Sequence, residues 1–138
     1  MTAPNQLFDH EKLHVYAKTL EFVGWATTIL ERVPKSMAVH NQLDRSSTSI
    51  PLNIAEGTGK FTPPDRCRYY DSARGSALEC AASLDVLVAK RVLPANEIID
   101  GKMLLRPIVS MLVGLIKSVA PDRIFEEPTD YGSSVSES

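Results

Sequence analysis

The sequence predicts an all-α protein, an antiparallel up-down-up-down four-helix bundle. Apolar residues recur at spacings of three and four over four long segments, Pro and Gly separate these segments, and no stretch alternates as a β-strand does. The 138 residues, 43% hydrophobic and 23% charged, suffice for one folded domain and exclude a disulfide scaffold. An N-terminal extension over residues 1–8 is expected before the bundle, which covers residues 9–120. The expected helices cover about 9–33, 36–56, 63–92 and 95–119.

The first helix is expected to begin at Asp9, whose side chain would cap it, and to end before Pro34. Phe8 and Leu13 would form a hydrophobic staple at this start. One apolar stripe is predicted to face the core: Leu13, Tyr16, Leu20, Val23, Thr27 and Leu30. A second stripe lies well around the helix, where a monomer would leave it in water, and is therefore the candidate oligomer interface: Val15, Phe22, Trp25 and Ile29.

The second helix is expected to start at Ser36, to be kinked rather than broken by Pro51, and to stop at Gly57. Thr62 and Pro63 are typical of the N-cap and the first residue of a third helix. Small side chains in the middle of that helix would let a neighbouring helix approach closely. Its predicted inner seam is Tyr70, Ala73, Ala77, Cys80, Leu84 and Leu87.

The fourth helix follows Pro94 and is apolar on most of its surface, so several neighbours must cover it. After it, residues 121–138 are expected to be a disordered acidic tail, because they hold five acidic residues and one basic residue. We find neither a membrane-spanning segment nor a secretory signal, and therefore expect a cytoplasmic protein. Cys67 and Cys80 are expected to be reduced and buried.

Two short motifs resemble catalytic signatures without the usual context. His10, Glu11 and His14 spell H-E-x-x-H, the zinc-binding pattern of metalloproteases, but no motif marks a third ligand. The segment 57–60 resembles part of a phosphate-binding loop, but it follows a predicted helix, whereas a Walker loop follows a strand. We therefore expect no enzymatic activity, no metal and no cofactor, and a zinc hydrolase is a disfavoured alternative.

Basic residues concentrate in the centre of the chain, although the net charge of the whole chain is −2. They are interleaved with Phe61, Tyr69 and Tyr70, and such a composition can follow a phosphate backbone and stack on bases. A solvated face with ordinary ion pairs is the alternative interpretation. The candidate nucleic-acid contacts are Arg45, Lys60, Arg66, Arg68 and Arg74.

Residues 42–60 resemble the signature of the four-helix-bundle proteins encoded within intervening sequences of large-subunit (23S) ribosomal RNA genes. The core of the match is Ser49-Ile50-Pro51-Leu52-Asn53-Ile54-Ala55-Glu56-Gly57, and a second match runs over residues 69–84. The resemblance implies a ring-like homopentamer without known enzymatic activity. The related accessory variability determinant proteins of diversity-generating retroelements bind nucleic acid and a reverse transcriptase through a basic surface.

The leading hypothesis is therefore a non-enzymatic homo-oligomer, a pentamer by resemblance, that binds RNA or other nucleic acid. The resemblance makes Arg45, Lys60 and Arg74 the first candidates for these contacts. The alternative is a protein-protein scaffold or accessory subunit that docks a partner enzyme such as a reverse transcriptase. Asn53 and Glu56 have either a structural role near Pro51 or a functional one. The motif residues are Asn53, Glu56 and Gly57.

Overall fold

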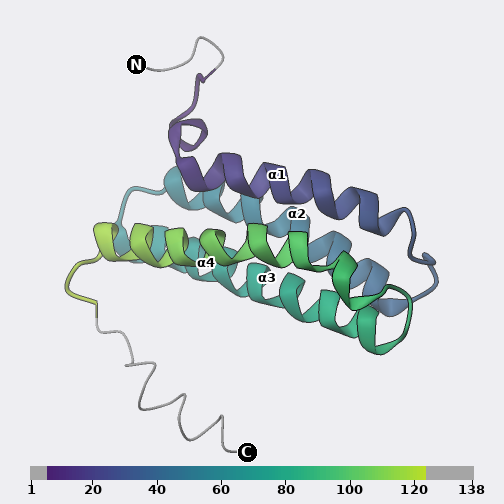
Figure 1. Ribbon diagram of the computed structural model, residues 1–138. Helices are drawn as coiled ribbons and strands as arrows, with labels where there is room; N and C mark the ends of the chain where they lie inside the picture. The colour runs from purple at the N-terminus through teal and green to yellow at the C-terminus, as the bar shows by residue number, and fades with distance from the viewer. Residues whose placement is uncertain (1–5, 124–138) are drawn as a thin grey trace, which may run out of the picture.

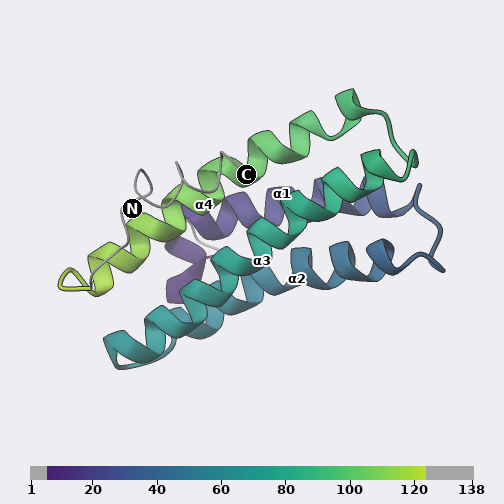
Figure 2. The same cartoon turned by 90° about the horizontal axis from the view of Figure 1, so that it is seen from below.

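The protein folds into four long helices and two short 3-10 turns in a computed structural model, which describes residues 6–123 and contains no strand within them. Consecutive helices run in opposite directions and lie side by side (Figures 1 and 2). Each helix contacts the next, and α4 also contacts α1, so the four helices enclose one main core, and a smaller cluster of Cys67, Tyr70 and Ile116 joins α3 to α4. The helices are α1 (His14–Leu30), α2 (Ala38–Thr58), α3 (Pro63–Ala89) and α4 (Ile99–Val119), and the 3-10 turns are η1 (Asp9–Lys12) and η2 (Ala95–Glu97).

The acidic tail predicted for residues 121–138 lies outside the described residues from position 124 onward. Among the helices of the described part, none has both the length and the hydropathy to cross a membrane.

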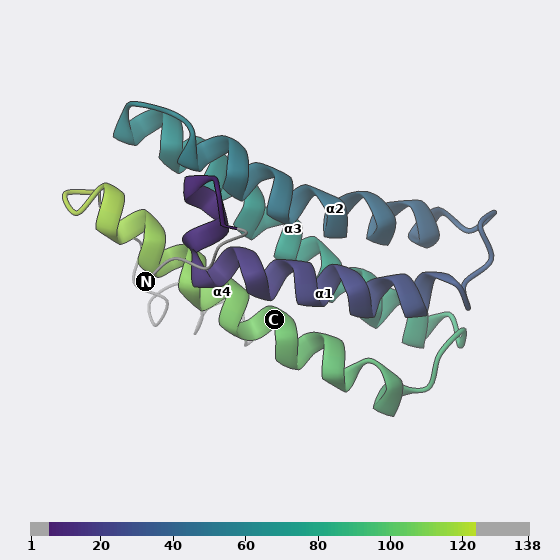
Figure 3. The same ribbon diagram turned by 90° about the horizontal axis from the view of Figure 1, so that it is seen from above.

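The first helix begins later than the sequence indicates. Asp9–Lys12 forms η1, and Leu13 is extended, with ψ 129°, before α1 begins at His14. The Phe8 backbone N–H donates to the Glu11 carboxylate at 3.2 Å and so caps η1. Asp9 is therefore not the N-cap of α1, and the staple is wrong because Phe8 is 64% exposed. Figure 3 shows η1 turned away from the axis of α1, next to α2, which it contacts.

Of the two apolar stripes of α1, the one expected at an oligomer interface is the more deeply buried. The stripe expected at an oligomer interface points into the bundle, where Trp25 packs against Gly101 of α4. That interface expectation is wrong, because the helices of a single chain already cover these side chains. The stripe predicted to face the core is only partly buried: Leu13, Tyr16 and Leu30 pack against the core, whereas Leu20 is 47% exposed. The buried members of the former set are Val15, Phe22 and Ile29.

The ends of the other helices differ from the expected positions by a few residues. α2 begins at Ala38 rather than at Ser36, continues through Pro51 without a break, and passes Gly57 before it ends. Thr62 caps α3 as predicted, because its side chain accepts a hydrogen bond from the Asp65 backbone N–H at 3.3 Å. The helix ends at Ala89, earlier than expected, and Arg91 then adopts a left-handed conformation with φ 63°. η2 separates Pro94 from α4.

α2 and α3 share the most extensive contact in the bundle. Three polar contacts join them: the Thr58 and Tyr70 hydroxyls lie 2.8 Å apart, Ser76 Oγ donates to Ser49 Oγ at 3.0 Å, and Cys80 Sγ donates to Ser46 Oγ at 3.2 Å. Between these contacts the side chains are small, so the two helices pack closely. The predicted inner seam of α3 is confirmed, since each of its residues is fully buried: Tyr70, Ala73, Ala77, Cys80, Leu84 and Leu87.

The two cysteines are buried and unpaired, as expected. Burial raises the pKa of the Cys80 thiol to about 11, although the hydrogen bond with Ser46 acts in the opposite direction. The thiol is therefore protonated at neutral pH and has little nucleophilic character.

The free energy of unfolding is expected to fall as the pH rises from 9 to about 11. In this window the unfolded chain loses the Cys80 proton near the ordinary pKa of 9.0, whereas the folded chain keeps it. Below pH 9 both states hold the proton, so the contribution is constant there. The Cys80 contribution across the window is on the order of 2 kcal/mol. Urea unfolding at several pH values measures it, and a Cys80→Ala variant with the same pH dependence as the wild type would contradict this assignment.

Candidate functional site

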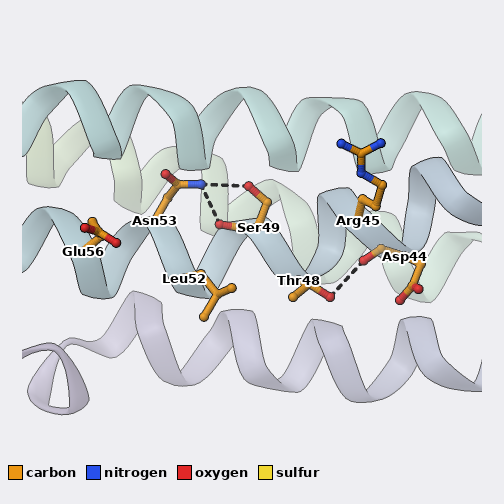
Figure 4. Close-up of a pocket in the computed structure, with 7 residues that line it drawn as sticks. All are labelled: Asp44, Arg45, Thr48, Ser49, Leu52, Asn53 and Glu56. Carbon is orange, nitrogen blue, oxygen red and sulfur yellow. Dashed lines mark hydrogen bonds between the residues drawn. The ribbon is translucent and has the colours of Figure 1, made fainter.

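An open groove of about 420 Å³ lies on the outward face of α2. Polar and charged side chains surround one leucine, Leu52, which is 62% exposed at the centre of the groove (Figure 4). Arg45 and Asn53 lie toward α3, while Leu52 points toward α1. Seven residues of α2 line the groove; Asp44 lies at its edge toward α1, and the other six are called the α2 stripe: Arg45, Thr48, Ser49, Leu52, Asn53 and Glu56.

Two residues of the α2 stripe hold α2 against α3. Asn53 Nδ2 donates to the Ser49 backbone carbonyl at 2.9 Å and to the Ser49 hydroxyl at 2.8 Å. The same hydroxyl accepts a hydrogen bond from Ser76 of α3. Asn53 therefore orients Ser49 for the contact between the helices, in the turn that contains Pro51. This arrangement gives Asn53 a structural role, one of the two roles considered for it.

The outward members of the α2 stripe have weaker ties to their own chain. The Glu56 carboxylate lies 3.6 Å from Lys60 Nζ, one turn later on the same side of the helix, and both side chains are partly exposed. A solvated ion pair of this kind contributes little to folding stability. Arg45 makes no hydrogen bond or ion pair within residues 6–123. Arg45, Leu52 and Glu56 are thus presented to solvent without a clear part in holding the fold.

Gly57 lies where the end of α2 crosses the beginning of α3. A Cβ atom at this position would lie 2.9 Å from Tyr69 Cβ, 2.9 Å from Tyr70 Cε1 and 3.0 Å from the Arg66 backbone carbonyl oxygen. These separations are shorter than van der Waals contact, so a glycine is what allows the two helices to approach this closely. The sequence predicted that Gly57 ends α2. This prediction is wrong, because the helix continues to Thr58.

Three of the five candidate nucleic-acid contacts gather at the connection between α2 and α3. Lys60 Nζ and the Arg68 guanidinium each lie 5.2 Å from the centre of the Tyr69 ring, which is a cation–π distance. Phe61, in the same connection, is 99% exposed. Arg66 Nε is buried and has no hydrogen-bond partner among the residues described. These five residues are called the basic cluster: Lys60, Phe61, Arg66, Arg68 and Tyr69.

The other two candidate contacts, Arg45 and Arg74, lie away from the basic cluster. Arg45 belongs to the α2 stripe and lies about 22 Å from Lys60 along the helix axis, at ~1.5 Å per residue. Arg74 follows Arg68 by six residues, about 240° around α3, so the two side chains leave the helix in different directions. The five cations therefore do not form one continuous surface in a single chain.

The H-E-x-x-H motif does not have the geometry of a zinc site. His10 lies in η1 with its ring edge against Tyr16, at 4.7 Å between ring centres, while His14 is the first residue of α1. The extended Leu13 between them removes the continuous helix on which the motif depends. Over residues 6–123, no group of three metal-ligating side chains comes together. The zinc-hydrolase alternative thus lacks a structural basis.

The helices and the motif on α2 define a class of protein, a small four-helix bundle with a polar signature on its second helix. Residues 11–114 match the family of 23S rRNA-intervening sequence proteins, and the chain belongs to this family. Its fold is similar to the crystal structure of a protein of unknown function from the S23 ribosomal protein family of Bacteroides thetaiotaomicron. The TM-score is 0.69 at 24% sequence identity, over 75% of this chain and 98% of that chain. No curated protein matches the sequence.

Replacement of Gly57 by Ala is expected to lower the free energy of unfolding by about 1–3 kcal/mol, because the methyl group overpacks the contact between α2 and α3. Gly24→Ala is the matched control: an added Cβ meets nothing within 4 Å there, and a gain of about 0.5–1 kcal/mol is expected. Urea unfolding followed by circular dichroism measures both changes. Similar changes in the two variants would contradict the role given to Gly57.

Proposed function

We propose that this chain is a non-enzymatic homo-oligomer that binds single-stranded nucleic acid through the basic cluster. The observation that carries the proposal is the exposed Phe61 ring, which follows Lys60 in the chain, in the connection where Lys60 and Arg68 both lie over the Tyr69 ring. An exposed aromatic face stacks on an unpaired base, and neighbouring cations contact the phosphates on either side of it. Bases in a duplex are already stacked, so single strands fit this arrangement better.

The charge of one basic cluster is small, so repetition in an oligomer is part of the proposal. Lys60 pairs with Glu56 at 3.6 Å, and Arg68 pairs with Asp65 at 3.7 Å, which offsets much of the positive charge. In an oligomer each subunit adds one cluster, and the gain from released counterions adds across the copies. The resemblance of the α2 motif supports a ring of five subunits, which would present five clusters to one strand.

A scaffold for a partner protein, such as a reverse transcriptase, is the second candidate function. The exposed α2 stripe favours it, because Leu52 and the charged groups around it form the mixed surface on which proteins dock. The two functions differ in their response to salt. Phosphate contacts weaken steeply as the salt concentration rises, whereas a contact centred on an apolar side chain does not.

Phe61→Ala is expected to weaken binding of a labelled single-stranded RNA about fivefold to a hundredfold, because stacking contributes ~1–3 kcal/mol per base. Binding of the matched duplex should change little. The double variant Lys60→Ala, Arg68→Ala should weaken binding of both ligands and flatten the dependence of log Kd on log salt. Fluorescence anisotropy at low and moderate salt measures all of these effects.

Arg106→Ala is the matched control for this series, because Arg106 is an exposed arginine on α4, outside the basic cluster. It should bind RNA as the wild type does. The proposal fails if the wild-type protein binds no RNA or single-stranded DNA at low salt, or if Arg106→Ala weakens binding as much as the cluster variants.

A further inference from the structure

The centre of the α2 stripe is exposed to solvent in the single chain. Leu52 is 62% exposed between Arg45, which has no partner within residues 6–123, and Glu56, which has only a solvated one on its own helix. The side of α2 next to the stripe is fixed against α3 by the Cys80–Ser46 hydrogen bond and by Gly57, and Ser49 at the edge of the stripe accepts a further bond from Ser76, so the helix cannot roll to bury Leu52. Whatever covers this leucine must come from outside the chain.

The α2 stripe is also symmetric about its own midpoint, which falls between positions 50 and 51. Arg45 lies as many residues before this midpoint as Glu56 lies after it, and the two side chains carry opposite charges. Suppose that two identical helices pair antiparallel about a twofold axis that passes this midpoint. A residue of one helix then lies opposite the residue of the other helix that is equally far on the other side of the midpoint. The other residues of the stripe form two further such pairs, Thr48 with Asn53 and Ser49 with Leu52, whereas Asp44 at the edge of the groove is level with Gly57.

We infer that the α2 stripe binds the α2 stripe of a second copy of this chain, antiparallel and about a twofold axis. In this pair, Arg45 of each copy faces the partner's Glu56, so a single sequence supplies both ion pairs. Leu52 lies opposite the short hydroxyl side chains at positions 48 and 49. The two copies of Leu52 are about 4.5 Å apart along the helix axes, so their side chains cover each other.

The charges and the leucine play different parts in this contact. Burial of Leu52 supplies the attraction, since an exposed apolar side chain gains free energy when it leaves water. The two charge pairs set the direction, because a parallel pair would place Arg45 opposite Arg45 and Glu56 opposite Glu56. This contact does not depend on nucleic-acid binding. Because it is twofold, it joins two rings if rings of five form, and it makes a dimer if they do not.

Charge exchange tests the pairing directly. Arg45→Glu and Glu56→Arg should each lower the native mass, because like charges then face each other across the axis. An equimolar mixture of the two single variants should associate again, since one copy then carries two acidic groups and the other two basic ones. The double variant R45E/E56R should also regain the wild-type mass. Native mass spectrometry measures the mass, and circular dichroism checks that every variant stays helical.

Covalent trapping supplies a second measurement that is independent of charge. In L52C, the two introduced thiols should form an intersubunit disulfide on mild oxidation, because facing Cα atoms of close-packed helices come within its reach. L78C is the control: Leu78 is 45% exposed on α3, outside the α2 stripe. Covalent dimer from L52C, with little from L78C or the wild type, supports the inference. Equal trapping of L52C and L78C, or native masses that the single charge variants and their mixture leave unchanged, would overturn it.

Discussion

The close packing of α2 against α3 is the constraint on which the rest of the structure depends. Three polar contacts bridge the two helices, and two of them, Ser49–Ser76 and Ser46–Cys80, use small side chains that let the backbones approach closely. Near the end of α2, Gly57 has no side chain, and a Cβ atom there would clash with α3. Because one side of α2 is fixed in this way, the rotation of the helix about its axis is fixed too. The part of α2 that contacts neither α3 nor α1 must then face solvent.

Because of this constraint, the residues of the α2 motif fall into two groups: those that contact α3 and those that face solvent. Ser49, Asn53 and Gly57 maintain the contact with α3, through hydrogen bonds in the first two cases and the absence of a side chain in the third. Arg45, Leu52 and Glu56 share the same helix turns but have no such task. A motif read along the sequence joins both groups, and only the position of α3 separates them.

The same distinction explains what the sequence could predict. The inner seam of α3 was predictable because its residues recur at spacings of three and four from Tyr70 to Leu87, so they share one face of the helix. α1 has two stripes, and periodicity alone does not say which one faces the core. The fit of Trp25 against Gly101 of α4 decides between them, and this is a contact between residues far apart in the sequence. The beginning of α1 was missed because the break at Leu13 carries no proline or glycine. The basic cluster could be predicted where its members are neighbours in the sequence, but the separation of Arg45 and Arg74 from it depends on helix faces.

The positions of the basic cluster and the α2 stripe on the same helix link the two proposals. Lys60 lies one turn beyond Glu56, at the end of the stripe, so each copy in an antiparallel pair carries its cluster beyond the ion pair with its partner. The two copies of Lys60 would then be about 28 Å apart along the paired helices, at ~1.5 Å per residue. A twofold axis that relates antiparallel helices leaves both clusters on the side of the pair that faces α3. Under the two proposals, a single strand laid along that side would meet two basic clusters in succession, and the contact between α2 helices would set the spacing between these clusters.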